Sequence, residues 1–556
     1  MNKIETLLVD KIKEAVFSTF HIELADDFIV IEIPKDNSNG DFSTNVAMKL
    51  TKLVKQKPNV TAEMLVEKLN KNCDFVERIE VAGVGFINFF IKNDILADII
   101  NTIIDAKDDY GQNKSGNNLK ILVEYVSANP TGPLHCGHAR GAAWGDAICR
   151  LLKKSGYDVL REYYINDAGN QIDMLGKSIY GRYRQHYGLD FTLPDDGYHG
   201  QDIIEITKEI IDEVGDKYLY SDKQEAVDYF KWEGRNKELN RIKEDLAYYG
   251  CQFDSWVSEQ WIVDEKRVDQ ALEKMIAMGL TYKQDGAFWF KSTEYGDDKD
   301  RVLKKSDGFY TYLTPDIANH QYKFERGYEK LVNLWGADHH GYIARMKAAM
   351  TALGHPKDAL EVDLIQMVRL VEDGVEVKMS KRTGNAITIR ELVDEVGLDA
   401  ARYFFVSKAV DTHLDFDFNL AKSETSDNPV YYAQYAYARI CSVLRQYSAE
   451  KLDSYSLLND EKEISLLKHL GQFTSVVADG AKTRAPHKVC NYIQKLAQYF
   501  HSFYATNKIW DENNLQLSKE RLALVEATRI TLKNALDLIG VSAPERMWLS
   551  KQLKRL

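Results

Sequence analysis

The segment that decides the fold begins with the apolar run Ile121-Leu122-Val123-Glu124-Tyr125-Val126. It continues through the turn-forming Asn129-Pro130-Thr131-Gly132-Pro133 and returns to an apolar run at Val159 to Ile165. Between the two runs, Gly137 to Lys154 has a helical pattern that Gly156 ends. A strand, a helix and a strand in this order form a βαβ unit, which predicts a parallel sheet with a ligand site above the carboxyl ends of its strands.

The sequence on the carboxyl side of this unit extends the sheet. Leu331 to Trp335 and Leu364 to Val371 are further strand candidates. Between them and the βαβ unit, about Gly181 to Arg301 is charged, mostly helical in pattern and poor in parallel-strand signals. We therefore predict a Rossmann-like catalytic domain at 113–420 with a helical insertion at about 181–301.

The two ends of the chain have different patterns. Residues 1–112 alternate helical and strand-like segments and include the β-forming stretch Val84 to Ile91, while Gly111 to Asn118 is polar and aperiodic, as expected of a linker. From Ala421 onward, apolar residues recur at three- and four-residue spacing. The predicted fold class is a multidomain α/β protein with a small N-terminal α/β domain (1–112) and a C-terminal all-α bundle (421–556).

The composition excludes several classes of protein. Apolar residues make up 44% of the chain, and no run approaches the ~18 apolar residues that a membrane span requires. The first residues form an amphipathic pattern rather than a secretory signal, so we expect a cytoplasmic protein and no membrane contact. The six cysteines occur singly without a C-x-x-C pair, so neither a structural metal nor a disulfide framework is expected.

The net charge is unevenly distributed. The formal charge is −12, yet Ala421 to Leu556 contains 19 Lys and Arg against 14 Asp and Glu. This last region can meet phosphate groups or can be an ordinary solvated helical surface, and the charge alone does not choose between them.

The first chemical motif is His135-Cys136-Gly137-His138, at the start of the predicted helix. A helix N-terminus presents unpaired N–H groups and a partial positive charge, so it binds phosphates. The two histidines can add donors, and Gly137 leaves room for a flat base beside the backbone. An isolated H-x-G-H is equally compatible with histidines that only cap a helix, but the position directly after a βαβ strand favours phosphate binding.

The second motif is Lys378-Met379-Ser380-Lys381. It follows a predicted hairpin in which Glu372-Asp373-Gly374 joins Met367–Val371 to Val375–Met379. Two lysines three residues apart on a loop can close on a triphosphate and neutralise the charge that develops as pyrophosphate leaves. K-x-x-K alone is common on solvated surfaces, so the prediction rests on its combination with H-x-G-H in a βαβ framework.

Together the two motifs resemble the HIGH and KMSKS signatures of class I aminoacyl-tRNA synthetases, with Cys136 in place of isoleucine and Arg382 in place of the last serine. The resemblance implies that an amino acid attacks ATP to form an adenylate and is then esterified to tRNA, with Mg²⁺ accompanying ATP. It implies catalytic roles for His135, His138, Lys378 and Lys381. It implies ATP contacts from the same four residues together with Gly137 and Met379.

Longer stretches resemble the arginyl-tRNA synthetases of bacteria in particular. The resemblance includes an acidic strand residue before N-P-T-G-P-L-H and extends to both ends of the chain. It is carried by Val123 to His135, Tyr163 to Gln171, Asp307 to Ala318, Gly336 to Gly341, Gly40 to Phe42 and Val541 to Met547. The family implies arginine, ATP and an arginine-accepting tRNA as partners, and we expect a monomer.

The resemblance also implies which residues bind arginine. Glu124 lies on the strand before the first motif, and the family comparison places Asp316 opposite it, so that two carboxylates grip a guanidinium. Asn129, Tyr312 and Asp338 would hold the α-amino and carboxylate groups. Taken alone, Glu124 is also compatible with an edge-strand residue and Asp316 with a helix cap near Ile317.

Two regions are candidates for tRNA contact. Phe86 and Asn88 match positions at which some bacterial relatives read a base of the D-loop, and an aromatic ring near an amide suits an unpaired base. Core packing for Phe86 and a turn role for Asn88 fit the spacing equally well. The helical C-terminal region would bind the anticodon, with the aromatic stretch Tyr431 to Tyr437 as a candidate surface or as ordinary core.

Three alternatives differ in what the sequence should contain. A class I synthetase for cysteine would favour a zinc–thiolate site, and one for isoleucine, leucine or valine a large editing insertion. A tRNA-binding paralogue without activity would not need both phosphate-binding motifs. A small nucleotidyltransferase would lack the helical C-terminal region. Each is disfavoured by this sequence.

Overall fold

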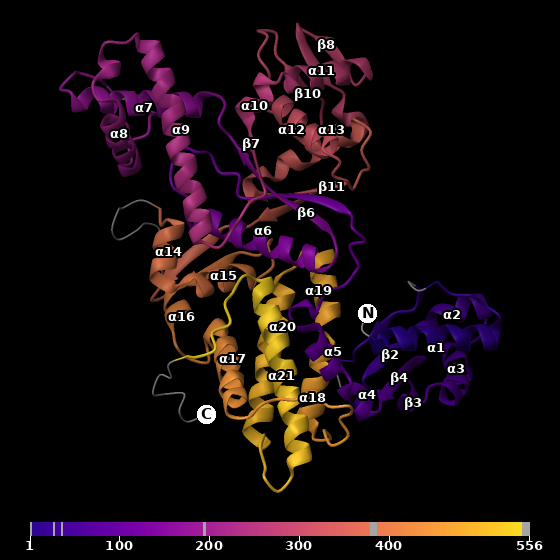
Figure 1. Ribbon diagram of the computed structural model, residues 1–556. Coiled ribbons are helices and arrows are strands. Elements are labelled where there is room, and N and C mark those ends of the chain that lie inside the picture. Colours follow the sequence, from indigo (N-terminus) through magenta and orange to yellow (C-terminus); the bar gives the residue numbers. More distant parts are fainter. Residues whose placement is uncertain (1–2, 26–27, 35–36, 193–195, 378–385, 548–556) are drawn as a thin grey trace.

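The computed structural model describes residues 3–25, 28–34, 37–192, 196–377 and 386–547. Figure 1 shows a central sheet with helices on both faces, two lobes above it, a helical bundle below it and a small domain to one side. This arrangement is the predicted mixed α/β fold.

The central sheet has five strands in the order β12-β11-β5-β6-β7, and every neighbouring pair is parallel. The chain builds β5, β6 and β7 outward in one direction and then returns to add β11 and β12 on the other side of β5. This reversal places a crevice at the carboxyl ends of β5 and β11, where parallel α/β folds bind their ligands. The strands are β5 (Lys120–Glu124), β6 (Asp158–Ile165), β7 (Ser255–Ser258), β11 (Lys330–Gly336) and β12 (Leu360–Ile365).

Helix α6 (Cys136–Lys154) confirms the predicted helix between the first two strands and covers one face of the sheet. Its sheet-facing residues are small because the backbone lies close to the strands. A Cβ on Gly145 would come within 2.3 Å of the Tyr125 ring, so no larger residue fits there without moving the helix.

The opposite face of the sheet is covered by helices that carry half of the candidate site. They pack in one apolar core with Leu122, Tyr164 and Val257 from the sheet. A small antiparallel sheet, β10-β9-β8, lies outside them. These elements are α10 (Glu259–Asp264), α11 (Arg267–Ala277), β8 (Thr281–Gln284), β9 (Ala287–Phe290), η5 (Ser292–Tyr295), β10 (Arg301–Lys304), α12 (Leu313–Glu325), η6 (Ala337–Tyr342) and α13 (Ile343–Ala352).

The segment predicted as a helical insertion contains more than helices. Its first part forms α7 (Asn170–His186), α8 (Gln201–Val214), η4 (Lys217–Leu219) and α9 (Lys223–Tyr248) around a separate apolar core, as the upper-left lobe of Figure 1. Its second part supplies β7, which pairs with β6 in the central sheet. The four residues of β7 are too few to give a recognisable strand pattern in the sequence.

The hairpin before the second motif is present. Strands β13 (Val368–Glu372) and β14 (Val375–Glu376) pair around Asp373 and Gly374, whose φ angles of 52° and 76° are those of a type I′ turn. The predicted strand Leu364 to Val371 is in fact two strands, β12 and β13, in different sheets. The region continues through α14 (Ile389–Val396), α15 (Leu398–Val406), β15 (Leu414–Asp417) and α16 (Phe418–Lys422).

The N-terminal domain is a four-stranded antiparallel sheet, order β1-β2-β4-β3, packed against three helices. It comprises α1 (Lys3–Phe20), β1 (Ile31–Glu32), η2 (Asn37–Asn39), β2 (Phe42–Thr44), α2 (Val46–Val54), α3 (Pro58–Asn72), β3 (Val76–Ala82) and β4 (Phe86–Ile91). It leads into α4 (Asn93–Ala97), α5 (Ile99–Ala106) and η3 (Lys107–Asp109). The polar stretch Gly111 to Asn118 is hydrogen-bonded to the end of α6, for example from the Gly116 N–H to the Ser155 carbonyl at 2.8 Å.

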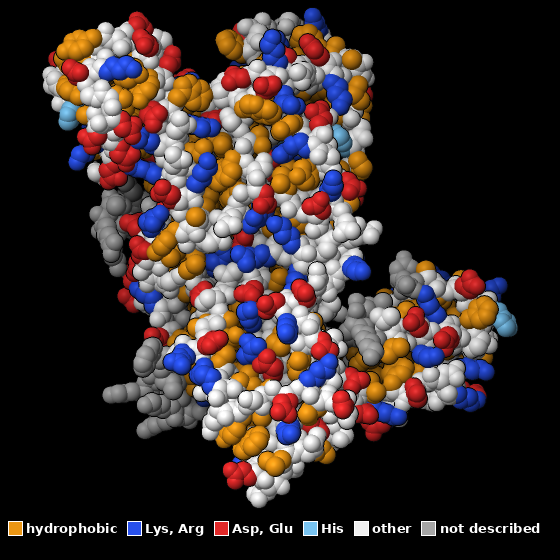
Figure 2. Space-filling model, in the orientation of Figure 1, with side chains coloured by type: hydrophobic (Ala, Val, Ile, Leu, Met, Phe, Trp, Pro, Cys, Tyr) orange, Lys and Arg blue, Asp and Glu red, His pale blue; other side chains and the backbone are white. Residues whose placement is uncertain are grey.

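The C-terminal bundle confirms the predicted helical region and includes one helix, α20, that periodicity did not single out. Its helices are α17 (Pro429–Gln446), α18 (Glu461–Gly471), α19 (Phe473–Lys482), α20 (His487–Thr506) and α21 (Leu515–Leu538). Their core is continuous with that of the α6 side of the central sheet. Figure 2 shows Lys and Arg side chains mixed with acidic ones over this face, with several basic side chains where the sheet region meets the bundle. Within the described ranges, no helix is both long and apolar enough to span a membrane.

Candidate functional site

The candidate site lies at the crevice beside β5, where the backbone is strained. Val126 and Ser127 have φ angles of 69° and 41°, and a β-branched residue in this region is a rare conformation that must be held by its surroundings. The Ser127 hydroxyl donates to Glu124 at 3.1 Å and accepts the Tyr164 N–H, also at 3.1 Å. The strained turn therefore fixes the last residue of β5 and starts the loop that leads to the first motif.

The two motif histidines form a reciprocal cap on α6. Nδ1 of His135 accepts the N–H of Gly137 at 3.1 Å, and Nδ1 of His138 accepts the N–H of His135 at 3.2 Å. The ring centroids are 3.9 Å apart. A Cβ on Gly137 would come within 2.9 Å of the His135 ring, so the glycine keeps room for that ring.

Burial and the two cap hydrogen bonds together determine the charge and the tautomer of both histidine rings. Burial lowers the pKa of His138 to about 3, helped by His135, and burial lowers the pKa of His135 as well. Both imidazoles are therefore neutral near pH 7. Because each Nδ1 accepts a backbone N–H, each proton is on Nε2, which leaves two Nε2–H donors at the N-terminus of α6.

The second motif, Lys378 to Lys381 with Met379, lies outside the described residues, but both of its flanks are tied to the first motif. On the carboxyl side, the Cys136 N–H donates to the Ile387 carbonyl and the Ile389 N–H to the Leu134 carbonyl, each at 2.9 Å. On the amino side, Arg140 of α6 donates to the carbonyl of Gln366 at 2.8 Å, just before the hairpin. The segments on both sides of the second motif are thus hydrogen-bonded to α6 or to the loop just before it.

Glu124 ends β5 and is buried. Its carboxylate contacts the ammonium of Lys323 from α12, which is fully buried. This pairing was not predicted from the sequence. It rules out a solvated edge-strand role for Glu124, which lies in the middle of the five-stranded sheet.

Asp316 lies in the first turn of α12, whose start at Leu313 precedes the predicted cap position. Its carboxylate accepts the hydroxyl of Tyr342. Burial, together with the nearby Glu124, raises the pKa of Asp316 to about 6 despite that hydrogen bond. The structure therefore brings Glu124 and Asp316 into one electrostatic environment.

Sequence reasoning missed a third carboxylate, Glu259, at the start of α10. Burial and the charges of Asp316 and Asp167 raise its pKa to about 7. The hydroxyl of Tyr164, buried among these carboxylates, has no hydrogen-bond partner in the described structure. Only the grouping in space reveals Glu259, because its segment carries no motif.

The other predicted arginine contacts lie on or directly beside the elements that carry Glu124, Asp316 and Tyr342. Asn129, in the loop after β5, donates to Gln171 at the start of α7. Tyr312 is 89% exposed at the start of α12. The Asp338 side chain is 81% exposed in η6, 3.5 Å from His339. All three are on segments that follow or face the strand ends.

The predicted tRNA contacts are distributed differently. Phe86 is half-buried at the start of β4, whereas Asn88 is buried in the same strand and accepts the Ser43 hydroxyl at 2.7 Å. Asn88 is therefore not a turn residue. In α17, Tyr431, Tyr435 and Tyr437 are all at least nine-tenths buried.

Comparison with known proteins gives the family. Residues 2–91 match the arginyl tRNA synthetase N-terminal domain, residues 99–425 the catalytic domain of class I tRNA synthetases (R), and residues 433–547 the DALR anticodon binding domain. An arginine–tRNA ligase of Anoxybacillus flavithermus is 52% identical over 558 residues, which cover 98% of this chain and 100% of that protein. The chain belongs to the arginyl-tRNA synthetases.

A second relative agrees with this assignment, and a solved structure shares the fold. An arginine–tRNA ligase of Bacillus cereus is 51% identical over 558 residues, covering 98% of this chain and 100% of that protein. The Thermus thermophilus arginyl-tRNA synthetase structure superposes with a TM-score of 0.76 at 22% identity, over 98% of this chain and 100% of that one. This arginyl-tRNA synthetase attaches arginine to tRNA for protein synthesis and uses ATP to do so.

Proposed function

We propose that the guanidinium of the substrate binds between Glu124 and Asp316, with Glu259 as a third carboxylate. The observation that carries this proposal is that Asp316 and Glu259 both resist ionisation, yet neither forms an ion pair among the described residues. A cation between them would stabilise the ionised forms that burial disfavours and would offset the repulsion among the carboxylates. A planar guanidinium also has enough N–H groups to reach several carboxylates and the free oxygen of Tyr164 at once.

Competition by substrate analogues tests this pocket. Canavanine keeps a guanidinium-like fork and should compete with arginine for the wild-type enzyme. Lysine offers a point charge of different geometry and should compete poorly. Equal inhibition constants for the two analogues would mean that the site recognises a positive charge whatever its geometry. The proposed binding of a planar guanidinium between Glu124 and Asp316 would then be wrong.

At the other end of the site, the Nε2–H groups of His135 and His138 donate to the phosphates of ATP. Gly137 keeps the base and the His135 ring from colliding with a side chain, and Lys378, Met379 and Lys381 close on the nucleotide from the second motif. ATP arrives with Mg²⁺ as part of the substrate complex. The arginine carboxylate attacks the α-phosphate, diphosphate leaves, and the arginyl-adenylate then transfers its acyl group to tRNA with release of AMP.

The arginine backbone is held at the rim. Asn129 and Asp338 face the α-ammonium and Tyr312 covers the bound substrate. The support for this part is position along the chain: Asn129 follows β5, Tyr312 precedes α12 and Asp338 follows β11, and the side chains of Tyr312 and Asp338 are exposed.

The tRNA contacts follow the domains. Phe86 of the 1–112 domain stacks on an unpaired base, and Asn88 supports the same strand through Ser43 or turns its amide to the base. The bundle at 421–556 binds the anticodon, and the 113–420 domain with its 181–301 insertion carries out the chemistry. We propose that the enzyme acts as a monomer in the cytoplasm.

A further inference from the structure

A row of polar residues crosses the central sheet beneath α12. Asn333 of β11, Glu124 of β5, Glu162 of β6 and Ser255 of β7 are register partners on adjacent parallel strands. Polar side chains this deep in a sheet must satisfy one another or be satisfied by the layer above. The row lies on the face covered by α12, so that helix supplies its partners.

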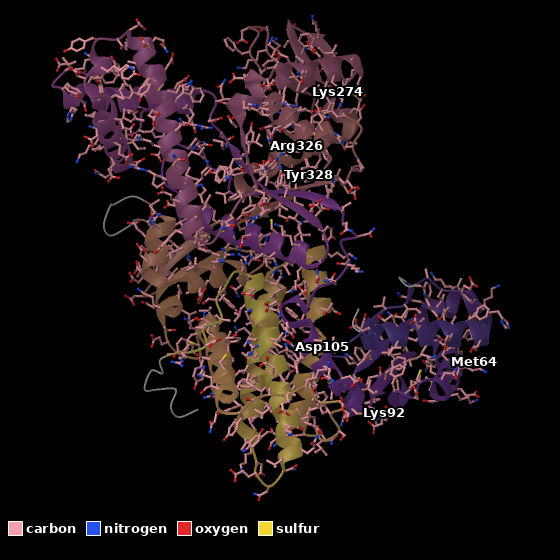
Figure 3. The ribbon with its side chains drawn as sticks, in the orientation of Figure 1. Met64, Lys92, Asp105, Lys274, Arg326 and Tyr328 are labelled. Carbon is pink, nitrogen blue, oxygen red and sulfur yellow. The ribbon has the colours of Figure 1, made fainter. Side chains whose placement is uncertain are left out.

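The cations of α12 pair unequally with the two carboxylates of the row. Lys323 contacts one oxygen of Glu124 and stands 3.6 Å from Oε1 of Glu162. Glu162 binds Arg326 at 2.6 Å through Oε2, whereas its Oε1 has no hydrogen-bond partner in the described part of the chain. Figure 3 shows Arg326 beside Tyr328, near the start of β11. An unoccupied carboxylate oxygen therefore lies next to a lysine that is already bound to the neighbouring carboxylate.

The same helix is connected to the substrate pocket. Asp316 precedes Lys323 by seven residues, two helical turns, so both side chains are on one face of α12. His320 lies between them. Its Nδ1 donates to the Asp316 carbonyl at 2.7 Å and its Nε2 accepts the amide of Asn333 at 2.6 Å. Lys323 is thus the one described cation in direct contact with a carboxylate of the proposed pocket.

We propose that Lys323 is a positioning residue that serves Glu124 and Glu162 in turn. In the free enzyme it neutralises Glu124. When the substrate cation reaches Glu124, the ammonium moves to the free Oε1 of Glu162. Glu124 is then paired both before and after binding, and Glu162 gains a contact that it lacked. This inference rests on the proposed role of Glu124 in binding arginine.

The move is small and keeps every charge paired. An ammonium has three donors and no fixed plane, so it can pass between two carboxylates where a guanidinium would have to turn its whole fork. Without such an exchange, a buried Glu124 would need a second cation to displace the first, and binding would pay the cost of an unpaired buried charge.

A double-mutant cycle in full-length enzyme tests the exchange. Lys323→Met should raise the arginine KM at pH 7 by at least tenfold, because a buried carboxylate without a cation takes up a proton more readily. Raising the pH to 9 should recover most of that loss. Glu162→Gln removes the second acceptor, leaves the lysine competing for Glu124, and should raise the arginine KM about fivefold. The ATP KM should stay within twofold in both.

The double variant Lys323→Met/Glu162→Gln distinguishes exchange from simple structural damage. With no lysine to exchange, the second substitution should add nothing, and the double variant should match Lys323→Met alone. If the double variant showed the product of the two single-variant increases in arginine KM, the proposal would be wrong. It would also be wrong if Lys323→Met lowered the arginine KM, because the lysine would then only compete with arginine for Glu124. Lys323→Arg keeps a cation but has to turn its whole fork, so its arginine KM at pH 7 should lie between those of the wild type and Lys323→Met.

Two further variants separate failure of this inference from failure of the pocket. Lys330→Met removes another half-buried lysine–glutamate pair, between Lys330 at the start of β11 and Glu361 of β12, and should leave the arginine KM unchanged. Glu124→Gln tests the pocket itself. If it raises the arginine KM while Lys323→Met does not, the lysine proposal alone is wrong; an unchanged KM in Glu124→Gln would remove the basis of both.

Discussion

The two ends of the substrate site meet opposite charges by different means. At the proposed arginine end, burial and, to a smaller extent, neighbouring carboxylates raise the pKa of Asp316 to about 6 and that of Glu259 to about 7. At the phosphate end, the described groups carry no charge: two neutral imidazoles and the N-terminus of α6 present N–H dipoles.

The difference shows where specificity is built into the fold. The rise of the Asp316 pKa from 3.8 to about 6 corresponds to ~3 kcal/mol against its ionised form, and a bound cation would reduce this cost. The phosphate end has no such cost, because its donors are paired within the cap or point outward. The buried carboxylates therefore favour a cation before the substrate arrives, whereas on our proposal phosphate binding also needs the lysines of the second motif.

Removal of one pocket carboxylate should have the largest effect. Asp316→Asn or Glu124→Gln keeps the size of the side chain but leaves the guanidinium under-paired, at a cost of ~2–5 kcal/mol. The arginine KM should rise by a factor on the order of 30 or more. The ATP KM should hardly change, since the phosphates bind at the other end. Steady-state kinetics with each substrate varied in turn measures both.

Asp269 provides a matched control for Asp316. It accepts the hydroxyl of Tyr310, just as Asp316 accepts that of Tyr342, but it lies on α11 outside the pocket. Asp269→Asn should leave both KM values unchanged. If Asp316→Asn behaved like this control, Asp316 would have a structural role only. The proposed difference between a charged arginine end and an uncharged phosphate end would then be wrong.

The second prediction concerns the phosphate end. His138→Ala and Lys381→Ala should each slow adenylate formation more than tenfold, because each removes stabilisation of developing charge worth ~1.4 kcal/mol or more. His138→Gln keeps a donor near the position of Nε2 and should be faster than His138→Asn, which does not reach it. Single-turnover adenylate formation with tRNA present gives the rates. Equal rates in Gln and Asn variants would contradict the assigned tautomer.

Much of the fold was predictable because its signals are local. The βαβ unit around α6, the hairpin at Asp373 and Gly374 and the helical C-terminal region all follow from periodicity and turn residues. Strand β7 was not predictable, because four residues carry too little pattern and its place beside β6 is set by tertiary packing.

The candidate site divides in the same way. The motif histidines were found because their spacing matches the start of a helix. Glu259 and Lys323 were not, because a carboxylate or a lysine on an ordinary helix has no local signature. Their importance comes from burial beside carboxylates that the fold brings to them: Glu259 is distant in the sequence from Asp316, and Lys323 is distant from Glu124. Charge complementarity in a core is a property of three-dimensional packing.

The pH dependence of arginine binding gives a third, smaller effect. A raised pKa means that Glu259 gains a proton as the pH falls through about 7 and Asp316 as it falls through about 6, while the guanidinium stays charged. The arginine KM should therefore rise about tenfold from pH 8 to pH 6. Glu259→Gln should have a higher KM at pH 8 and a flatter profile above pH 7. An arginine KM that is constant over this range would contradict the raised pKa values.

The smallest effect should come from Gly137→Ala. This substitution should change the ATP KM through packing around His135 while leaving thermal stability nearly unchanged. The added Cβ would lie 2.9 Å from the His135 ring, so the ring must turn and lose its 3.1 Å bond from the Gly137 N–H. The Nε2–H of His135 then no longer points at the phosphates, and the ATP KM should rise about threefold. Thermal stability should change by less than ~1 kcal/mol, because alanine is the better helix former. Gly480→Ala, whose Cβ would meet Leu151 at an ordinary 3.5 Å in another helix, should leave the ATP KM as it is. Equal ATP KM values in the two variants would show that the His135 ring does not need the space that Gly137 leaves.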